Sequence, residues 1–319
     1  RSIPRGVWAL GLVSLLMDTS SELIHSLLPA FLVTVVGAEP ALVPERLKKI
    51  YERFRMNVAT NGLIRIPTEG LEAMPLGIAL WGNRRTDARL RADESRDLFS
   101  LALENYRDDP RAFFYYTVAP GHAHEIEPVV EEIVANGNKV LFNYYSDVSN
   151  LGGDLGYRQG FDAVRRAVDR MIERYPDMMY TTRYLNRVTT TGLLAGERWG
   201  YEVCTNLTID NPVNAERLAN GKPFNPHFRA INADFRTTRR CCTGVARDCA
   251  SCFDTWEHFS WVMINMRRHL GSATEFADWL TTMFAFYVVN RLVDTTTGHE
   301  LLASAQARDT DLLPHARTA

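Results

Sequence analysis

The segment AFFYYTVAPGHAHEIEPVVEEIVANGNKVLFNYYS, residues 112–146, determines the fold that we expect for this chain. Its pattern predicts a buried strand over 112–120, a helix over 126–137 that ends at a glycine, and a second buried strand over 138–146. Two strands joined by a helix form a parallel pair with a right-handed crossover. The segment therefore predicts an α/β fold.

The same alternation extends in both directions. On the N-terminal side, we expect strands in RMNVATNGL (55–63) and PLGIALWG (75–82), and helices over 41–54 and 92–107. On the C-terminal side, FDAVRRAVDRMIERYP (161–176) has the apolar spacing of an amphipathic helix. Successive βα units with short connections favour a parallel sheet that closes into a barrel or a partial barrel.

The composition restricts the class of protein. The chain has 319 residues, 46% of them hydrophobic, so it can bury a substantial core as one main domain with additions. Its net charge of -2 gives no long-range attraction to nucleic acid, so we expect a small-molecule substrate of unknown identity and no nucleic-acid partner. The cysteines number five and crowd into the second half, which indicates metal binding in a reducing compartment. We therefore expect a cytoplasmic body.

The N-terminal segment has a different character. Between Gly6 and Ala38, the only charged residues are Asp18 and Glu22, within an island that separates two apolar runs. Each run is shorter than the roughly 20 apolar residues that span a bilayer, although the whole stretch is long enough. Membrane contact through residues 6–38 is one interpretation, and a signal-like leader or a buried strand and helix are the alternatives.

The strongest chemical motif is RRCCTGVARDCASCFDTW. Cys242, Cys249 and Cys252 follow the spacing C-x6-C-x2-C, with Cys241 as an alternative first ligand and Cys204 as a distant fourth. Iron–sulfur clusters and zinc both accept four cysteine thiolates. We expect an iron–sulfur cluster, with zinc as the alternative metal, and unrelated core cysteines as the remaining interpretation.

Polar and aromatic side chains follow the predicted strands, where ligands bind in parallel α/β folds. These strand-end residues are Glu39, Thr60, Asn61, Trp81, Thr117, Asn143 and Tyr145. Directly after one strand, GHAHE places His122, His124 and Glu125 where they could bind a metal or move a proton. Their spacing is not the i, i+4 pattern that puts two ligands on one helix face, so an ordinary polar loop is the alternative.

Two resemblances to known families accompany these patterns. The stretch IPRGVWALGLVSLLMDTSSELIHSLLPAFLVTVVGA resembles the first membrane helix of a major facilitator superfamily transporter. The segments GAEP (37–40), RMNVATNGL, IALWG (78–82), Phe113 to Ser146 and the cysteine motif, in that order, resemble a radical S-adenosylmethionine (SAM) protein. This second resemblance covers residues 37–293. It implies a partial parallel (β/α) barrel with a C-terminal cysteine-rich helical extension.

The radical SAM resemblance also implies ligands and site residues. The C-terminal cysteines would hold an auxiliary 4Fe-4S cluster, and the barrel would bind S-adenosylmethionine. The family's Gly-Gly-Glu-Pro motif corresponds to Gly37, Ala38, Glu39 and Pro40, with Ala38 as a departure. Its Thr-Asn-Gly motif corresponds to residues 60–62, so that Thr60 and Asn61 would contact the ligand, and Asn143 would line the pocket on a later strand.

One motif of that family is missing. Radical SAM enzymes carry CxxxCxxC after the first strand, but no cysteine precedes Cys204, so we expect no reductive cleavage of S-adenosylmethionine. The transporter-like stretch occupies the place where that strand is expected. The chain therefore resembles a join of two genes at about Gly37. The expected organisation is a transporter-like segment over 1–38, a partial barrel over 39–195, a metal-cluster region over 196–293, and a disordered polar tail over 294–319.

Overall fold

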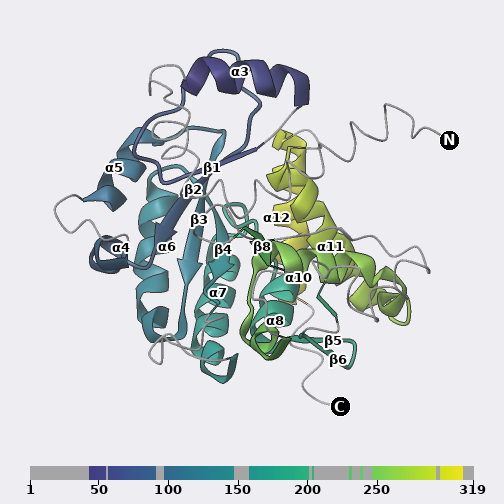
Figure 1. Cartoon of the computed structure of the whole chain (residues 1–319). Helices are drawn as coiled ribbons and strands as arrows, with labels where there is room; N and C mark the ends of the chain where they lie inside the picture. Colours follow the sequence, from purple (N-terminus) through teal and green to yellow (C-terminus); the bar gives the residue numbers. More distant parts are fainter. Residues whose placement is uncertain are drawn as a thin grey trace.

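A computed structural model describes residues 43–54, 57–90, 97–146, 158–200, 203–204, 230–231, 238–239, 246–291 and 295–311. A four-stranded parallel sheet forms the centre of the molecule (Figure 1). Its strands lie side by side in chain order: β1 (Val58–Thr60), β2 (Leu76–Trp81), β3 (Ala112–Val118) and β4 (Lys139–Tyr144). The predicted α/β class with a parallel sheet is confirmed. The sheet does not close into a barrel within the described ranges.

Helices connect the strands and extend the fold beyond them. The first group comprises α3 (Val43–Phe54), α4 (Arg84–Leu90), α5 (Leu98–Asn105), the 3₁₀ helix η2 (Pro120–Glu125), α6 (Ile126–Ala135), η3 (Arg158–Phe161), α7 (Asp162–Arg174) and α8 (Arg183–Thr191). The second group comprises η4 (Ala246–Ser251), α10 (Thr255–Ile264), η5 (Met266–His269), α11 (Ala273–Val289) and α12 (Thr295–Asp311). Two short antiparallel hairpins pair β5 (Leu193–Leu194) with β6 (Glu197–Arg198) and β7 (Ala230–Ile231) with β8 (Thr238–Arg239).

The chain takes up the position of a further strand beside β4. Met179 forms a parallel bridge with Val140, whose backbone N–H donates to the carbonyl of Met178 at 2.9 Å. The N–H of Tyr180 donates back to the carbonyl of Val140 at 2.8 Å. The βα alternation therefore continues one step beyond the four-stranded sheet, in the same sequential order.

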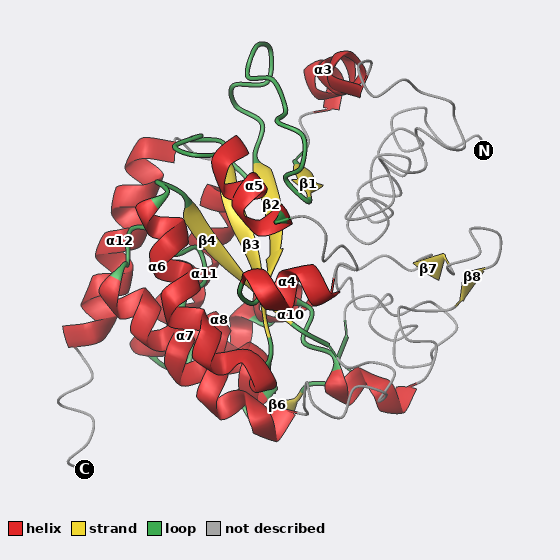
Figure 2. Ribbon diagram, turned by 90° about the vertical axis from the view of Figure 1, so that its left-hand side faces the viewer, coloured by secondary structure: helices red, strands yellow, loops and turns green. Residues whose placement is uncertain are grey.

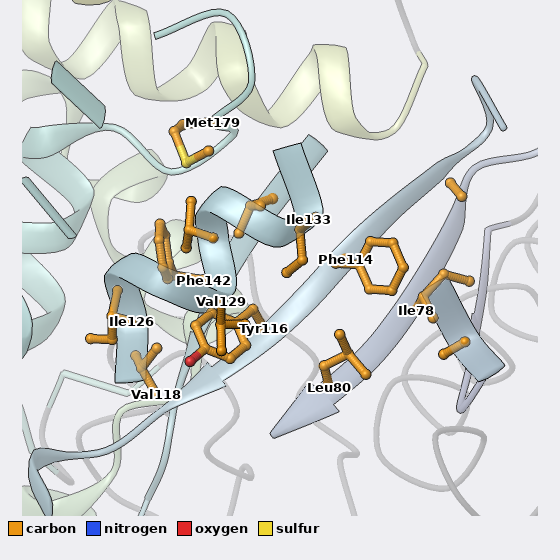
Figure 3. Close-up of a cluster of buried hydrophobic side chains, with 14 of the residues drawn as sticks. Ile78, Leu80, Phe114, Tyr116, Val118, Ile126, Val129, Ile133, Phe142 and Met179 are labelled. Carbon is orange, nitrogen blue, oxygen red and sulfur yellow. The ribbon is translucent and has the colours of Figure 1, made fainter. Parts of the chain in front are cut away.

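Alternating side chains of the strands pack into two separate cores. On one face, Ile78, Phe114 and Phe142 contact the helices α5, α6 and α7, as Figure 3 shows for α6 with Ile126 and Ile133. Strand β3 is buried along all seven of its residues, because helices cover both faces of the sheet (Figure 2). This burial on both faces explains why the strands are apolar in sequence.

The C-terminal helices cover the other face. Phe113 and Leu141 of the sheet pack against α8, α10 and α11, together with Phe259 and Trp261 of α10. In a closed barrel, further strands would face these side chains. Here the helical extension supplies the second layer, and Phe259 and Trp261 are core residues.

The expectation of a disordered tail over 294–319 was wrong for residues 295–311. These residues form α12, in which Leu302 is buried and the amide of Gln306 donates to the carbonyl of Met179 at 2.9 Å. Leu302 and Gln306 are four residues apart, so they share the helix face that docks beside the sheet. Because this segment is mostly polar, its sequence did not indicate the short face of α12 that packs beside the sheet.

The transporter-like segment lies outside the described residues. Those residues include no helix of sufficient length and apolar character to cross a membrane.

Candidate functional site

The carboxyl ends of β2, β3 and β4 bring the predicted strand-end residues together. Trp81 pairs with Thr117, and Thr117 pairs with Asn143, along the ladders of the sheet. The Asn143 side-chain amide donates to Thr117 Oγ1 at 3.0 Å. The ring of Trp81 lies edge-on to that of Tyr145, with the centroids 5.1 Å apart. Ligands of parallel α/β sheets bind at this edge, so these side chains outline a candidate site.

The remaining predicted contacts on β1 serve a local turn. Thr60 Oγ1 accepts from the N–H of Gly62 at 3.3 Å, and Asn61 Oδ1 accepts from the N–H of Leu63 at 3.2 Å. Gly62 has a φ of +77°, and a Cβ there would lie 2.7 Å from that of Ala102. Thr60 and Asn61 therefore hold the strand end in shape.

Three predicted S-adenosylmethionine contacts, Gly37, Glu39 and Pro40, lie outside the described residues.

A buried carboxylate occupies the same edge. Glu125, which is 5% exposed, accepts hydrogen bonds from the N–H of Asn83 at 2.7 Å and from the hydroxyl of Thr86 at 2.9 Å. His122 Nδ1 lies 3.1 Å from Glu125 Oε1. The carboxylate favours the tautomer with its proton on Nδ1, which leaves Nε2 as the proton acceptor. His122 is thereby oriented as a candidate base.

Local sequence places this carboxylate. Pro120 begins the 3₁₀ helix η2 directly after β3, and Glu125 is its last residue. Gly82, with a φ of +52°, leaves space for Glu125, because a Cβ there would collide with Oε2. His124 lies at the rim of this cluster, with Nε2 3.9 Å from Glu125 Oε1 and its side chain 77% exposed. The GHAHE motif thus contributes a paired histidine and carboxylate, whereas its second histidine lies on the surface.

Two of the predicted metal ligands lie in a turn at the end of β4. The backbone N–H of Cys252 donates to the carbonyl of Cys249 at 3.1 Å. The next residue, Phe253, donates its N–H to Ser146 Oγ at 2.7 Å. Thr255 Oγ1 donates to a backbone carbonyl of β4 at 3.2 Å. These bonds anchor the C-x2-C turn to the edge of the sheet where the strand-end residues lie.

The turn also contacts the strand-end set directly. Thr255 Oγ1 lies 3.4 Å from Asn143 Oδ1, so one strand-end amide lies between Thr117 and the helix that follows the cysteines. The sequence separates Asn143 from Thr255 by 112 residues. Only the tertiary fold reveals that the C-x2-C turn and the strand-end residues share one edge.

The thiols differ in exposure. Cys249 is buried, whereas Cys252 and Cys204 are partly buried, and all three are free of disulfide bonds. Burial raises the pKa of the Cys252 thiol, and the nearby Asp254 adds to this shift. Without a bound cation, this thiol is therefore protonated at neutral pH.

The described part of the chain contains no group of three or more His, Cys, Asp or Glu side chains placed to hold a metal ion. Cys241 and Cys242 lie outside that part, so the four-cysteine ligand set stays a prediction.

Comparison with known proteins gives no match, either to a family model, to a curated protein or to a solved structure.

Proposed function

We propose that this chain is an iron–sulfur protein derived from a radical SAM enzyme, with its metal centre at the carboxyl edge of the sheet. Cys249 and Cys252 supply two ligands, and Cys204, Cys241 and Cys242 are the candidates for the others. One observation carries the proposal: the C-x2-C turn is bonded to the end of β4, beside the strand-end residues. A metal held there lies next to the small-molecule site of a parallel α/β fold.

The two thiols of the C-x2-C turn suit a metal centre. Two thiols three residues apart in a tight turn suit both iron–sulfur clusters and zinc, which take thiolate ligands. A bound cluster would supply electron transfer, or cross-link the turn to the remaining cysteine segments. The acidic neighbours of Cys252 oppose free thiolates, so metal binding must displace the thiol protons.

The wider site would take S-adenosylmethionine or a substrate of unknown identity. The α/β sheet would be part of a radical SAM barrel, with Gly37, Glu39, Pro40, Thr60, Asn61 and Asn143 along its mouth. His122, oriented by Glu125, is the candidate for proton transfer. The body would be cytoplasmic, and residues 6–38 are its candidate for membrane contact.

Anaerobic reconstitution with iron and sulfide tests the metal centre. We expect visible charge-transfer absorption and acid-labile sulfide in the parent protein, and loss of most of both in Cys249→Ala and Cys252→Ala. Ser251→Ala lies in the same turn and retains both thiols, so it serves as the matched control. Unchanged iron content in both cysteine variants would contradict the ligand assignment. Stoichiometric zinc without sulfide would favour the alternative, a non-enzymatic zinc module.

The absence of CxxxCxxC leads to a separate expectation. Reductive cleavage requires a cluster that can bind S-adenosylmethionine through an open iron site, and no cysteine precedes Cys204. We expect no 5′-deoxyadenosine above a no-protein blank when the reconstituted chain is incubated with S-adenosylmethionine and dithionite. Product above that blank would refute this part of the proposal and leave the cysteine assignment intact.

A further inference from the structure

A cavity of about 280 Å³ lies among α7, α8, β5, η5 and α11. Its lining includes three arginines from three separate elements: Arg165 of α7, Arg187 of α8 and Arg268 of η5. None of these elements carries a cysteine or a strand-end residue of the candidate site. The cavity is therefore built from side chains that the proposed metal centre does not use.

The three arginines differ in whether they have an acidic partner. Arg165 pairs with Asp162 at 2.9 Å, and Arg268 pairs with Glu197 at 3.1 Å. Arg187 instead stacks its guanidinium over an aromatic ring, and no ion pair joins it to the described residues. In addition, Arg165 Nε is buried and has no hydrogen-bond partner within the described ranges. Arg187 and Arg165, which both line the cavity, therefore have donors that no described residue accepts from.

The remaining polar lining includes one carboxylate and a hydrogen-bonded pair of a tyrosine and a histidine. Among the described residues that line the cavity, Glu275 is the only acidic one. His269 is buried, and its Nδ1 lies 2.9 Å from the carbonyl of Asn265, which makes Nδ1 the protonated nitrogen. The Tyr184 hydroxyl then donates to His269 Nε2. Burial raises the pKa of Tyr184 to about 12, so the hydroxyl carries no negative charge at neutral pH.

We propose that this cavity binds the phosphate group of a small metabolite, with Arg187 as its principal ligand and with Arg165 and Arg268 beside it. Guanidinium groups match the oxygens of phosphate with paired donors, and several of them favour a dianion over a monoanionic carboxylate. The volume is near the lower end of ligand sites, which suits a small molecule. Leu194 and Ala195 give the lining an apolar part that suits the carbon skeleton of a phosphate monoester.

Calorimetric titration at constant ionic strength tests the proposal, with glycerol 3-phosphate, inorganic phosphate and acetate as probes. We expect both phosphates to bind more tightly than acetate, and the ester to bind more tightly than the free ion. Arg187→Gln should weaken phosphate binding by about tenfold or more, because it removes a charged hydrogen-bond donor. Arg170→Gln is the matched control, since Arg170 also lies on a helix of this layer but pairs with Glu127 outside the cavity.

Arg187→Lys separates loss of binding from loss of folding. It keeps the charge but not the paired donors, so its affinity should fall between those of the parent and of Arg187→Gln. Circular dichroism of each variant verifies that the fold is intact. The proposal is overturned if acetate binds as tightly as both phosphates, or if Arg170→Gln loses as much affinity as Arg187→Gln. Tighter binding of inorganic phosphate than of the ester would identify the free ion as the ligand.

Discussion

The buried carboxylate of Glu125 offers the sharpest test of the strand-edge cluster. In Glu125→Ala, three donors lose their acceptor: the N–H of Asn83, the hydroxyl of Thr86 and the imidazole of His122. The hydroxyl and the imidazole can turn or exchange tautomers, but the backbone N–H cannot. Each buried donor left unsatisfied costs about 1–3 kcal/mol, so we expect a total loss of about 3 kcal/mol in the free energy of unfolding.

Glu125→Gln should cost much less. Its amide oxygen can replace the carboxylate oxygen that accepts from Asn83, and its amide nitrogen can donate to the hydroxyl of Thr86 or to a deprotonated Nδ1 of His122. The shape of the side chain is kept, and only the charge assistance is lost. We expect a cost of about 1 kcal/mol, which is the net value of an ordinary hydrogen bond.

Urea denaturation followed by tryptophan fluorescence measures both costs. The matched controls are Glu127→Ala and Glu127→Gln, because Glu127 lies two residues away on the surface and pairs with Arg170. Exposed ion pairs contribute about 0–1 kcal/mol, so both controls should remain close to the parent. The reasoning fails if Glu125→Ala costs no more than Glu127→Ala, or if the alanine and glutamine variants of Glu125 are equally stable.

Three further predictions concern other buried groups. Gly82→Ala should lower the free energy of unfolding by about 2 kcal/mol or more, because φ is +52° and a Cβ would meet the Glu125 carboxylate. Gly271→Ala, at a position with open space around it, is the control in the same urea denaturation assay. Arg111→Leu should lower the free energy of unfolding by about 3–5 kcal/mol in thermal or urea unfolding, because it leaves Asp109 buried without its ionic partner. A loss below about 1 kcal/mol would contradict this prediction. Burial lowers the pKa of His299 to about 4 from 6.5, so the unfolded state takes up its proton first as the solution is acidified. Stability should therefore fall between about pH 6.5 and pH 4, and the fall should be smaller in His299→Gln; identical pH profiles would count against it.

The strands and the helices between them could be predicted because each carries its own signal. Strand β3 is buried over its whole length and mostly apolar, and helix α7 has one apolar face formed by Val164, Val168, Met171 and other residues. Burial on two faces favours a nearly continuous apolar run in a central parallel strand. Local pattern and tertiary environment therefore agree along this part of the chain.

Helix α8 shows why other elements escaped prediction. Its sequence RYLNRVTTT is rich in threonine, which has a low helix propensity. The helix is stabilised instead by the burial of Leu185 and Val188 in the second core. Two cap signals were present in the sequence, since Thr182 accepts from the N–H of Leu185 and Gly192 adopts the left-handed conformation after the last turn. A search for caps would have located this helix.

The candidate site was predictable as a region but not as a set of contacts. Strand ends identify Trp81, Thr117 and Asn143 in advance, because parallel strands finish at one edge. The bond between Thr86 and Glu125 joins residues 39 apart, and no spacing along the chain indicates it. For the same reason, the sequence could not show that the C-x2-C turn lies at this edge.

The position of that turn follows from the packing of α10. Phe259 and Trp261 bury α10 in the second core, and Asp254 caps its first turn by accepting from the N–H of Glu257 at 2.9 Å. Cys252 lies two residues before this cap, so the burial of the helix determines where its thiol lies. A protein that prepares two ligands in this way loses less conformational entropy when it binds a metal. The proposed metal centre therefore predicts that a cysteine variant would lose its metal and still keep α10 packed on the sheet.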